Sequence, residues 1–217
     1  MVAVRYQCIS NQVDQNMKEF YKKFVIPNYD SIAKELLDII EHDFLSNSKV
    51  NSWIYPVDQV LDACPNLNAF LKPRLKKELE QIKYYCTPAR QSLGAHVDGA
   101  NIKVPFGMNL PLMNTRDTSQ LWFDCPPENT ITRSLAGTIL RDGEGFLSDV
   151  HVPKDPKMMP VIKTLELDVP AITKTDIMHS VSNPTNNTRL IVVLRWNLSE
   201  IDYSEPEDVI DLEDLYV

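Results

Sequence analysis

Several features that would place a chain in a broad class at once are missing from this sequence. It contains no run of about eighteen apolar residues, so no transmembrane helix is predicted. Residues 1–7 lack the charged and then apolar pattern of a secretory signal, and we therefore expect a cytoplasmic protein. There is no basic stripe and the formal net charge is −8, so neither a nucleic acid nor a membrane is an expected partner.

The four cysteines are widely spaced and form no C-x-x-C pair, and no internal repeat or low-complexity stretch is present. A zinc ribbon and a dense disulfide framework are therefore not indicated, and we expect reduced thiols. What remains is 43% hydrophobic and 24% charged, which is typical of a soluble globular protein with a sizeable core. At 217 residues, the chain is expected to form a single domain, 1–217.

The sequence divides into three regions. Residues 1–82 read as a helical support region, because Ile32, Leu36 and Ile40 recur at helical spacing and further helices are predicted after Pro56 and over about 66–82. Residues 83–199 read as the catalytic core. Eight acidic residues and no base follow Arg195, so residues 200–217 are expected to form a solvated acidic tail.

The region from residue 83 onward consists of short β-rich segments separated by Pro, Gly, Asn and Asp. Strands without intervening helices favour a sandwich or barrel over a parallel sheet. The turn signal around Gly143 also predicts a hairpin within 139–147. The strands are expected at 83–86, 106–112, 120–124, 134–140, 145–150, 164–169, 176–182 and 188–197.

The most informative motif is His96-Val97-Asp98, followed far downstream by His179. In a strand, residues two apart point to the same side, so His96 and Asp98 can reach one ion together while Val97 faces away. Two imidazoles and one carboxylate on one face of a ferrous ion leave the opposite face open for a cosubstrate and dioxygen. This pattern predicts a metal centre made of His96, Asp98 and His179.

An arginine near the second histidine extends the pattern. His179 lies five residues before Pro184 and Arg189 lies five after it, with a turn-forming segment between them. Both side chains can therefore enter one cavity, where Arg189 offers a planar, charged fork for a carboxylate. Arg195 has the same strand parity, but it lies about six residues deeper, roughly 20 Å along an extended strand, so Arg189 is preferred.

In this order of motifs the sequence resembles the 2-oxoglutarate and Fe(II)-dependent dioxygenase superfamily, with the prolyl-hydroxylase-like members nearest. The resemblance covers about 84–197. It rests on His96-Val97-Asp98, on 108–112 as the following core strand, and on His179 leading to Arg189 and the apolar strand after it. The substrate-binding segments show no pattern that identifies a subfamily.

The resemblance implies a mainly β fold with N-terminal helices, whose core is a double-stranded β-helix, or jelly roll. It also implies that His96, Asp98 and His179 are catalytic ligands of Fe(II), and that Arg189 binds 2-oxoglutarate. With dioxygen as the other cosubstrate, the expected outcome is hydroxylation of a peptide or small molecule, with release of succinate and CO2. The presence of Asp98 argues against a halogenase, in which that carboxylate is lost.

Other residues carry weaker predictions. Tyr85, Asn109 and Trp122 occupy strands that are expected to line the cavity, where each could contact 2-oxoglutarate or substrate, although packing is the simpler role. His151, with Lys163 twelve residues later as its anion binder, is an alternative distal ligand.

Two other functions stay open at this point. One is a jelly-roll binding module without catalysis. The other is a cupin-type metalloenzyme that does not use 2-oxoglutarate and would need the metal ligands but not Arg189. The sequence does not indicate an oligomeric state.

Overall fold

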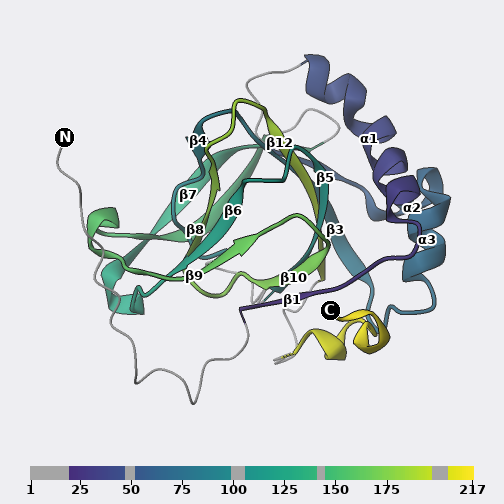
Figure 1. Ribbon diagram of the computed structural model, residues 1–217. Helices are drawn as coiled ribbons and strands as arrows, with labels where there is room; N and C mark the ends of the chain where they lie inside the picture. The colour runs from purple at the N-terminus through teal and green to yellow at the C-terminus, as the bar shows by residue number, and fades with distance from the viewer. Residues whose placement is uncertain (1–19, 47–51, 99–105, 141–144, 197–204) are drawn as a thin grey trace.

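The computed structural model describes residues 20–46, 52–98, 106–140, 145–196 and 205–217. These form two facing β-sheets with helices along one side (Figure 1). The larger sheet has the strand order β1-β10-β5-β12-β3-β2-β7-β8, and the smaller sheet has the order β4-β11-β6-β9. The bounds are β1 Tyr21–Lys23, β2 Ser52–Tyr55, β3 Leu79–Thr87, β4 Gln91–Ser92, β5 Phe106–Met113, β6 Ser119–Phe123, β7 Thr130–Leu140, β8 Gly145–Pro153, β9 Val161–Glu166, β10 Ala171–Lys174, β11 His179–Asn183 and β12 Arg189–Trp196.

The predicted jelly roll is confirmed by the strand order. β3, β12, β5 and β10 are neighbours in the larger sheet, whereas β4, β11, β6 and β9 form the smaller one, so the chain passes repeatedly from one sheet to the other. Most of the predicted strands are present, but two differences stand out. The strand predicted at 164–169 lies at Val161–Glu166, and the short strands β1, β2, β4 and β10 were not predicted, of which β1 and β2 lie in the region 1–82 that was expected to be helical.

Three helices cover the outer face of the larger sheet: α1 Tyr29–Ser46, α2 Val57–Ala63 and α3 Pro65–Leu71 (Figure 1). The predicted stripe of α1 is confirmed, because Ile32, Leu36 and Ile40 are all buried in the main core. Within the described ranges, none of the helices is long and apolar enough to cross a membrane.

The helix predicted over about 66–82 is wrong beyond Leu71. Pro73 lies two residues after Leu71, the last residue of α3. Proline cannot continue a helix, because it has no backbone N–H and its ring clashes with the preceding turn. The apolar residues that seemed to extend the stripe lie elsewhere. Leu79 and Ile82 belong to β3, which alternates between the helix-covered face and the face turned toward the smaller sheet.

This alternation along β3 and β12 determines what lies between the sheets. The even-numbered residues of β12 from Leu190 to Trp196 belong to the helix-side core, so its odd-numbered residues, including Arg189 and Arg195, occupy the opposite face. Their partners on β3 share that face: Arg189 pairs with Thr87, and Val193 pairs with Lys83. The inner face of the larger sheet is therefore unusually polar.

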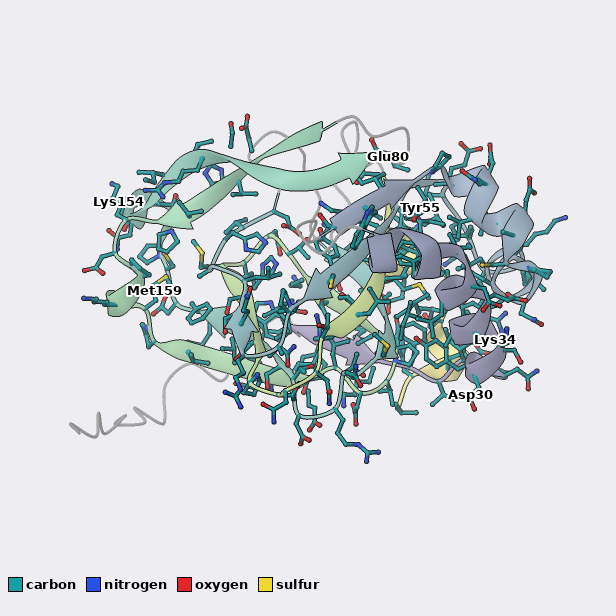
Figure 2. All side chains as sticks on the ribbon, turned by 90° about the horizontal axis from the view of Figure 1, so that it is seen from above. Asp30, Lys34, Tyr55, Glu80, Lys154 and Met159 are labelled. Atoms are coloured by element: carbon teal, nitrogen blue, oxygen red, sulfur yellow. The ribbon has the colours of Figure 1, made fainter. Side chains whose placement is uncertain are left out.

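β7 and β8 extend the larger sheet away from the helices and confirm the predicted hairpin, although the turn at 141–144 lies outside the described residues. Seen from above, Lys154 and Met159 lie at the end of the molecule opposite Asp30 and Lys34 of α1 (Figure 2). β2 joins this extension to the jelly roll by pairing with β3 on one side and with β7 on the other.

The solvated acidic tail is wrong from residue 205 onward. Val209, Ile210 and Leu212 are buried in the main core, and the Val209 carbonyl accepts hydrogen bonds from the Lys76 and Lys77 amides. The acidic residues alternate with these apolar ones and remain on the surface. Counting the charges alone therefore did not predict that this segment packs against the core. Figure 1 shows this segment beside the turn that follows α3.

Candidate metal centre

The segment that carries the H-x-D motif joins the two sheets. The His96 amide donates to the His179 carbonyl of β11 and the His179 amide donates back, both at 2.8 Å. The Val97 amide donates to the carbonyl of His151 in β8 at 2.8 Å, and the return bond is 3.2 Å. Consecutive residues of one short strand thus bond to opposite neighbours, which fixes the side chains of His96 and Asp98 relative to His179.

The three residues predicted as metal ligands are brought together by this arrangement. One ligand atom from each of His96, Asp98 and His179 lies within 4.8 Å of the others. The Nε2 atom of His96 lies 3.2 Å from Oδ1 of Asp98, and Nε2 of His179 lies 4.0 Å from Oδ2. Two imidazole nitrogens and a carboxylate oxygen at such separations are a donor set suited to Fe(II).

Backbone carbonyls hold both histidine rings in one orientation. Nδ1 of His96 lies 2.8 Å from the carbonyl oxygen of Gly94, and Nδ1 of His179 lies 2.9 Å from that of Ile177. A carbonyl can only accept, so each Nδ1 carries a proton, and in the neutral ring it is Nε2 that has the lone pair a metal would bind. Such outer hydrogen bonds are what fix the tautomer and direction of metal-ligating histidines.

The carboxylate of Asp98 is held by Arg195, whose Nη2 donates to Oδ2 in a short hydrogen bond. The sequence reasoning preferred Arg189 over Arg195 as the carboxylate binder, and it did not predict this contact with Asp98. Depth along one strand does not measure how far that strand lies from the segment that joins the two sheets. Arg195 also lies close enough to Tyr85 of β3 for the two groups to interact.

The protonation of the cluster follows from its burial and from these charges. Burial and the neighbouring charge of His96 lower the pKa of His179 to about 4, so its ring is neutral near pH 7, as a metal ligand must be. Burial acts to raise the pKa of Asp98, but the Arg195 guanidinium, the hydrogen bond from His96 and the charges of the two histidines together outweigh it and hold that pKa well below the usual range. For His96, burial acts to lower the pKa, and the hydrogen bond and charge of Asp98 raise it above its ordinary value.

Arg189, the predicted carboxylate binder, is fully buried, and its three side-chain nitrogens have no hydrogen-bond partner among the described residues. Burial lowers its pKa to about 10, which still leaves it charged at pH 7. The hydroxyl of Thr87, its partner on β3, is also buried without a partner there. Buried polar groups in proteins are nearly always hydrogen bonded, so these two adjacent donors indicate an acceptor that the described part of the chain does not supply.

The three residues with weaker predictions have different surroundings. Tyr85 is half-buried and lies beside Arg195. Asn109 is buried on β5 with its amide donating to Thr173 Oγ1 at 2.7 Å. Trp122 is fully buried against Phe20, and its Nε1 donates to the Lys174 carbonyl at 3.0 Å, which leaves no polar atom free for a ligand. Its surroundings are those of a packing residue.

The alternative distal ligand, His151, does not join the cluster. Because His151 is paired with Val97, its side chain lies on the same face as that of Val97, opposite to His96 and Asp98. Its Nδ1 lies 3.3 Å from the Thr132 hydroxyl. Lys163, the anion binder suggested with it, is exposed and lies over the ring of Tyr21.

Two polar residues on the inner face, Thr87 and Lys83, were missed by the sequence reasoning. A signal for both exists in the sequence, because they alternate with Ile82, Tyr84 and Cys86, which are buried against the helices. A lysine or threonine at the opposite parity of such a strand points between the sheets rather than into solvent.

Comparisons with known proteins add limited information. No protein-family model matches the chain, and no curated protein matches it. Among solved structures, it is similar to the carbocyclase SnoK from nogalamycin biosynthesis, a non-heme alpha ketoglutarate dependent enzyme, with 12% identity, 90% of each chain covered and a TM-score of 0.49. A Pseudomonas putida prolyl-4-hydroxylase matches with 12% identity over 82% of this chain and 90% of that one, at a TM-score of 0.41.

A third similar structure is an oxidoreductase of the 2OG-Fe(II) oxygenase family from Burkholderia pseudomallei. It has 12% identity and a TM-score of 0.32, with 61% of this chain covered. The match spans 46% of that protein, less than half of its length. Similarities this weak do not assign a function, which has to be argued from the site residues themselves.

Proposed function

We propose that the chain is an Fe(II)- and 2-oxoglutarate-dependent dioxygenase that hydroxylates a peptide or small molecule, with release of succinate and CO2. The single observation that carries this proposal is the fully buried guanidinium of Arg189, without a partner among the described residues, on the same strand face as Arg195, which contacts Asp98. A barrel that only binds a metal needs the ligand cluster but does not need the buried Arg189. A cosubstrate with a carboxylate at each end needs the metal for one end and Arg189 for the other.

In this proposal His96, Asp98 and His179 hold iron(II), and the carbonyls of Gly94 and Ile177 keep the two imidazole rings aimed at it. Iron held on one face by these groups supplies open positions for a cosubstrate and dioxygen. Arg195 holds one oxygen of Asp98, which restricts how that carboxylate can turn.

The distal carboxylate of 2-oxoglutarate would be bound by Arg189 and Thr87. Both offer buried N–H or O–H donors that lack acceptors, and charge-assisted hydrogen bonds from a buried arginine are among the strongest that proteins make. Tyr85 and Asn109 lie on the same inner face and would line the space between the carboxylate site and the metal. Trp122 has no part in this proposal.

The test measures 2-oxoglutarate binding to protein loaded with Zn(II), which prevents turnover, and succinate formation by protein loaded with Fe(II). Arg189→Met should weaken 2-oxoglutarate binding by roughly ten- to a hundredfold, because a hydrogen bond to a charged group contributes about 1.5–3 kcal/mol. Zn(II) affinity should stay unchanged. Thr87→Val should weaken 2-oxoglutarate binding less, whereas Thr87→Ser should restore it.

Either alternative function gives a different result in this experiment. A cupin-type enzyme would keep its turnover after Arg189→Met. A binding module would not bind 2-oxoglutarate even when loaded with metal. An unchanged metal affinity in His179→Ala would overturn the ligand assignment itself.

A further inference from the structure

Lys83 is a second cation, besides Arg189, that lies on the inner face of the larger sheet without an anion to balance it. Lys83 is 92% buried, since only 8% of its surface is exposed, and it pairs in register with Ile54 of β2 and Val193 of β12. No carboxylate in the described part of the chain lies within ion-pair distance of it. Its Nζ instead lies 4.7 Å from the ring centroid of Tyr85, over the ring face.

A buried ammonium in this position is costly. Proteins bury charges only when they are paired or bound to a ligand, and an aromatic ring offsets only part of the lost hydration. The contacts of Lys83 lead to the metal cluster in two steps: Tyr85 lies close enough to Arg195 for the two groups to interact, and Arg195 contacts Asp98. The uncompensated charge therefore lies on the same inner face as the groups that contact the candidate metal centre.

The charge of the cavity decides what would bind there. Its described residues include three cations, Lys83, Arg189 and Arg195, and one carboxylate, Asp98, which leaves an excess of two positive charges. Under the proposed function, Fe(II) and 2-oxoglutarate bring charges that cancel each other, so this excess persists in the loaded protein. Arg195 is engaged by Asp98, and Arg189 is assigned to the cosubstrate. Lys83 is the cation left over.

We infer that Lys83 forms a subsite for the carboxylate of an acidic substrate, next to the metal centre. That the bound acid is a substrate rests on the proposed function. The lysine lies on β3 toward β2 and the β7–β8 hairpin, whereas Arg189 lies at the start of β12 beside Thr87. Lys83 and Thr87, the partner of Arg189, are four positions apart on β3, so the two cations can bind different molecules.

The experiment uses protein loaded with Zn(II) and saturated with 2-oxoglutarate, so that the metal and Arg189 are occupied. Short monocarboxylates from acetate to hexanoate are titrated by calorimetry, each beside its uncharged primary amide. We expect at least one acid to bind tenfold or more tightly than its amide. Lys83→Met should reduce that preference to less than twofold, and Lys83→Arg should retain it.

Lys163→Met is the matched control, because Lys163 also lies over a tyrosine ring, 5.6 Å from the centroid of Tyr21, but is exposed. This variant should keep the acid preference. The absence of any acid preference in the wild type, or its persistence in Lys83→Met, would overturn the proposal. So would a tenfold loss of 2-oxoglutarate affinity in Lys83→Met, which would place Lys83 in the cosubstrate site.

A second readout needs no substrate. Without ligands, Lys83→Met should unfold at a higher temperature than the wild type, because an unpaired buried charge is replaced by an apolar chain of similar length. A lower unfolding temperature would indicate a structural lysine and contradict the inference. This measurement needs no 2-oxoglutarate, so it remains informative if the proposed function fails.

Discussion

Arg195 donates a hydrogen bond to the carboxylate of Asp98, which lies 97 residues earlier in the chain. The side chains of the two residues are only 12% and 15% exposed, so the pair is largely shielded from water. Without metal, Arg195 is the principal compensation for the Asp98 charge. With metal bound, the ion shares that task.

Replacing Arg195 should therefore destabilise the metal-free protein more than the metal-loaded one. We expect Arg195→Leu to cost about 3 kcal/mol in the absence of metal, because it leaves a buried carboxylate unpaired. Thermal unfolding with and without Zn(II) measures the difference, and the stabilisation by Zn(II) should be larger in the variant. An equal loss in both states would show that the guanidinium acts independently of the metal centre.

Gly107 of β5 permits the close packing on which this contact depends. A Cβ at that position would lie 2.9 Å from Cγ1 of Val193 and 3.8 Å from Cζ of Arg195. Gly107→Ala should cost about 1–3 kcal/mol by overpacking, and by displacing Arg195 it should also increase the stabilisation by Zn(II), as expected for Arg195→Leu. Urea unfolding and zinc titration provide the two measurements.

Gly94 offers a matched control for that substitution. Nothing lies within 4 Å of a Cβ built there, and its carbonyl, which holds His96, is unaffected by a methyl group. Gly94→Ala should leave Zn(II) affinity unchanged. If both alanine variants changed Zn(II) affinity equally, the contact with Arg195 would not be the reason.

Asn183 ties together the segments that surround Arg189. Its side-chain nitrogen lies 2.9 Å from the carbonyl oxygens of both Thr87 and Asn187, and its side-chain oxygen accepts from the hydroxyl of Thr185. Asn183→Ala should cost about 2–3 kcal/mol, because it leaves buried backbone carbonyls without donors. It should also weaken 2-oxoglutarate binding by loosening the start of β12.

Asn187→Ala is the comparison, because Asn187 takes part in this cluster through its backbone. Chemical unfolding and 2-oxoglutarate titration of both variants test the prediction. A loss of stability in Asn183→Ala with unchanged 2-oxoglutarate affinity would separate the turn from the proposed cosubstrate site.

Docking of the C-terminal segment should depend on pH through Glu207. Burial acts to raise its pKa, but hydrogen bonds from Lys22 and Tyr216 lower it below the ordinary value. The ionised form is therefore favoured in the folded state. The resulting stabilisation is fully present above the unfolded pKa of about 4.3 and is lost as pH falls through the lower folded value.

The effect should be below about 1 kcal/mol, because the pair is only partly shielded. Urea unfolding at pH 6 and at pH 3 should show a smaller pH-dependent loss for Glu207→Gln than for the wild type. Glu213→Gln, which alters an exposed acid of the same segment, should behave like the wild type. Identical pH dependence in the wild type and Glu207→Gln would contradict the assignment.

Strand alternation and turn chemistry explain why much of the core could be predicted. The same-face rule for residues two apart placed His96 with Asp98, and β-rich segments without helices between them indicated a sandwich or barrel, whereas the jelly roll itself was implied by the family resemblance. These arguments are local in sequence. They worked because a strand repeats every two residues whatever it packs against.

Most of what the sequence reasoning missed concerns how separate segments meet. The contact of Arg195 with Asp98 was not predicted, because distance along one strand says nothing about the angle at which a second sheet crosses it. The C-terminal segment was read from its acids, although Val209, Ile210 and Leu212 determine where it docks. The long helix failed for a local reason that was available, since Pro73 lies two residues after Leu71, the last residue of α3.

The strand that carries His96 and Asp98 bonds to β11 on one edge and to β8 on the other. The two sheets therefore cannot separate at this end without breaking the backbone hydrogen bonds that hold the ligand segment. Separation of β11 from β8 and loss of the metal centre are therefore expected to occur together, as a single cooperative event. A bound ion should consequently slow hydrogen exchange at the amides of Val97 and His151 as much as at those of His96 and His179.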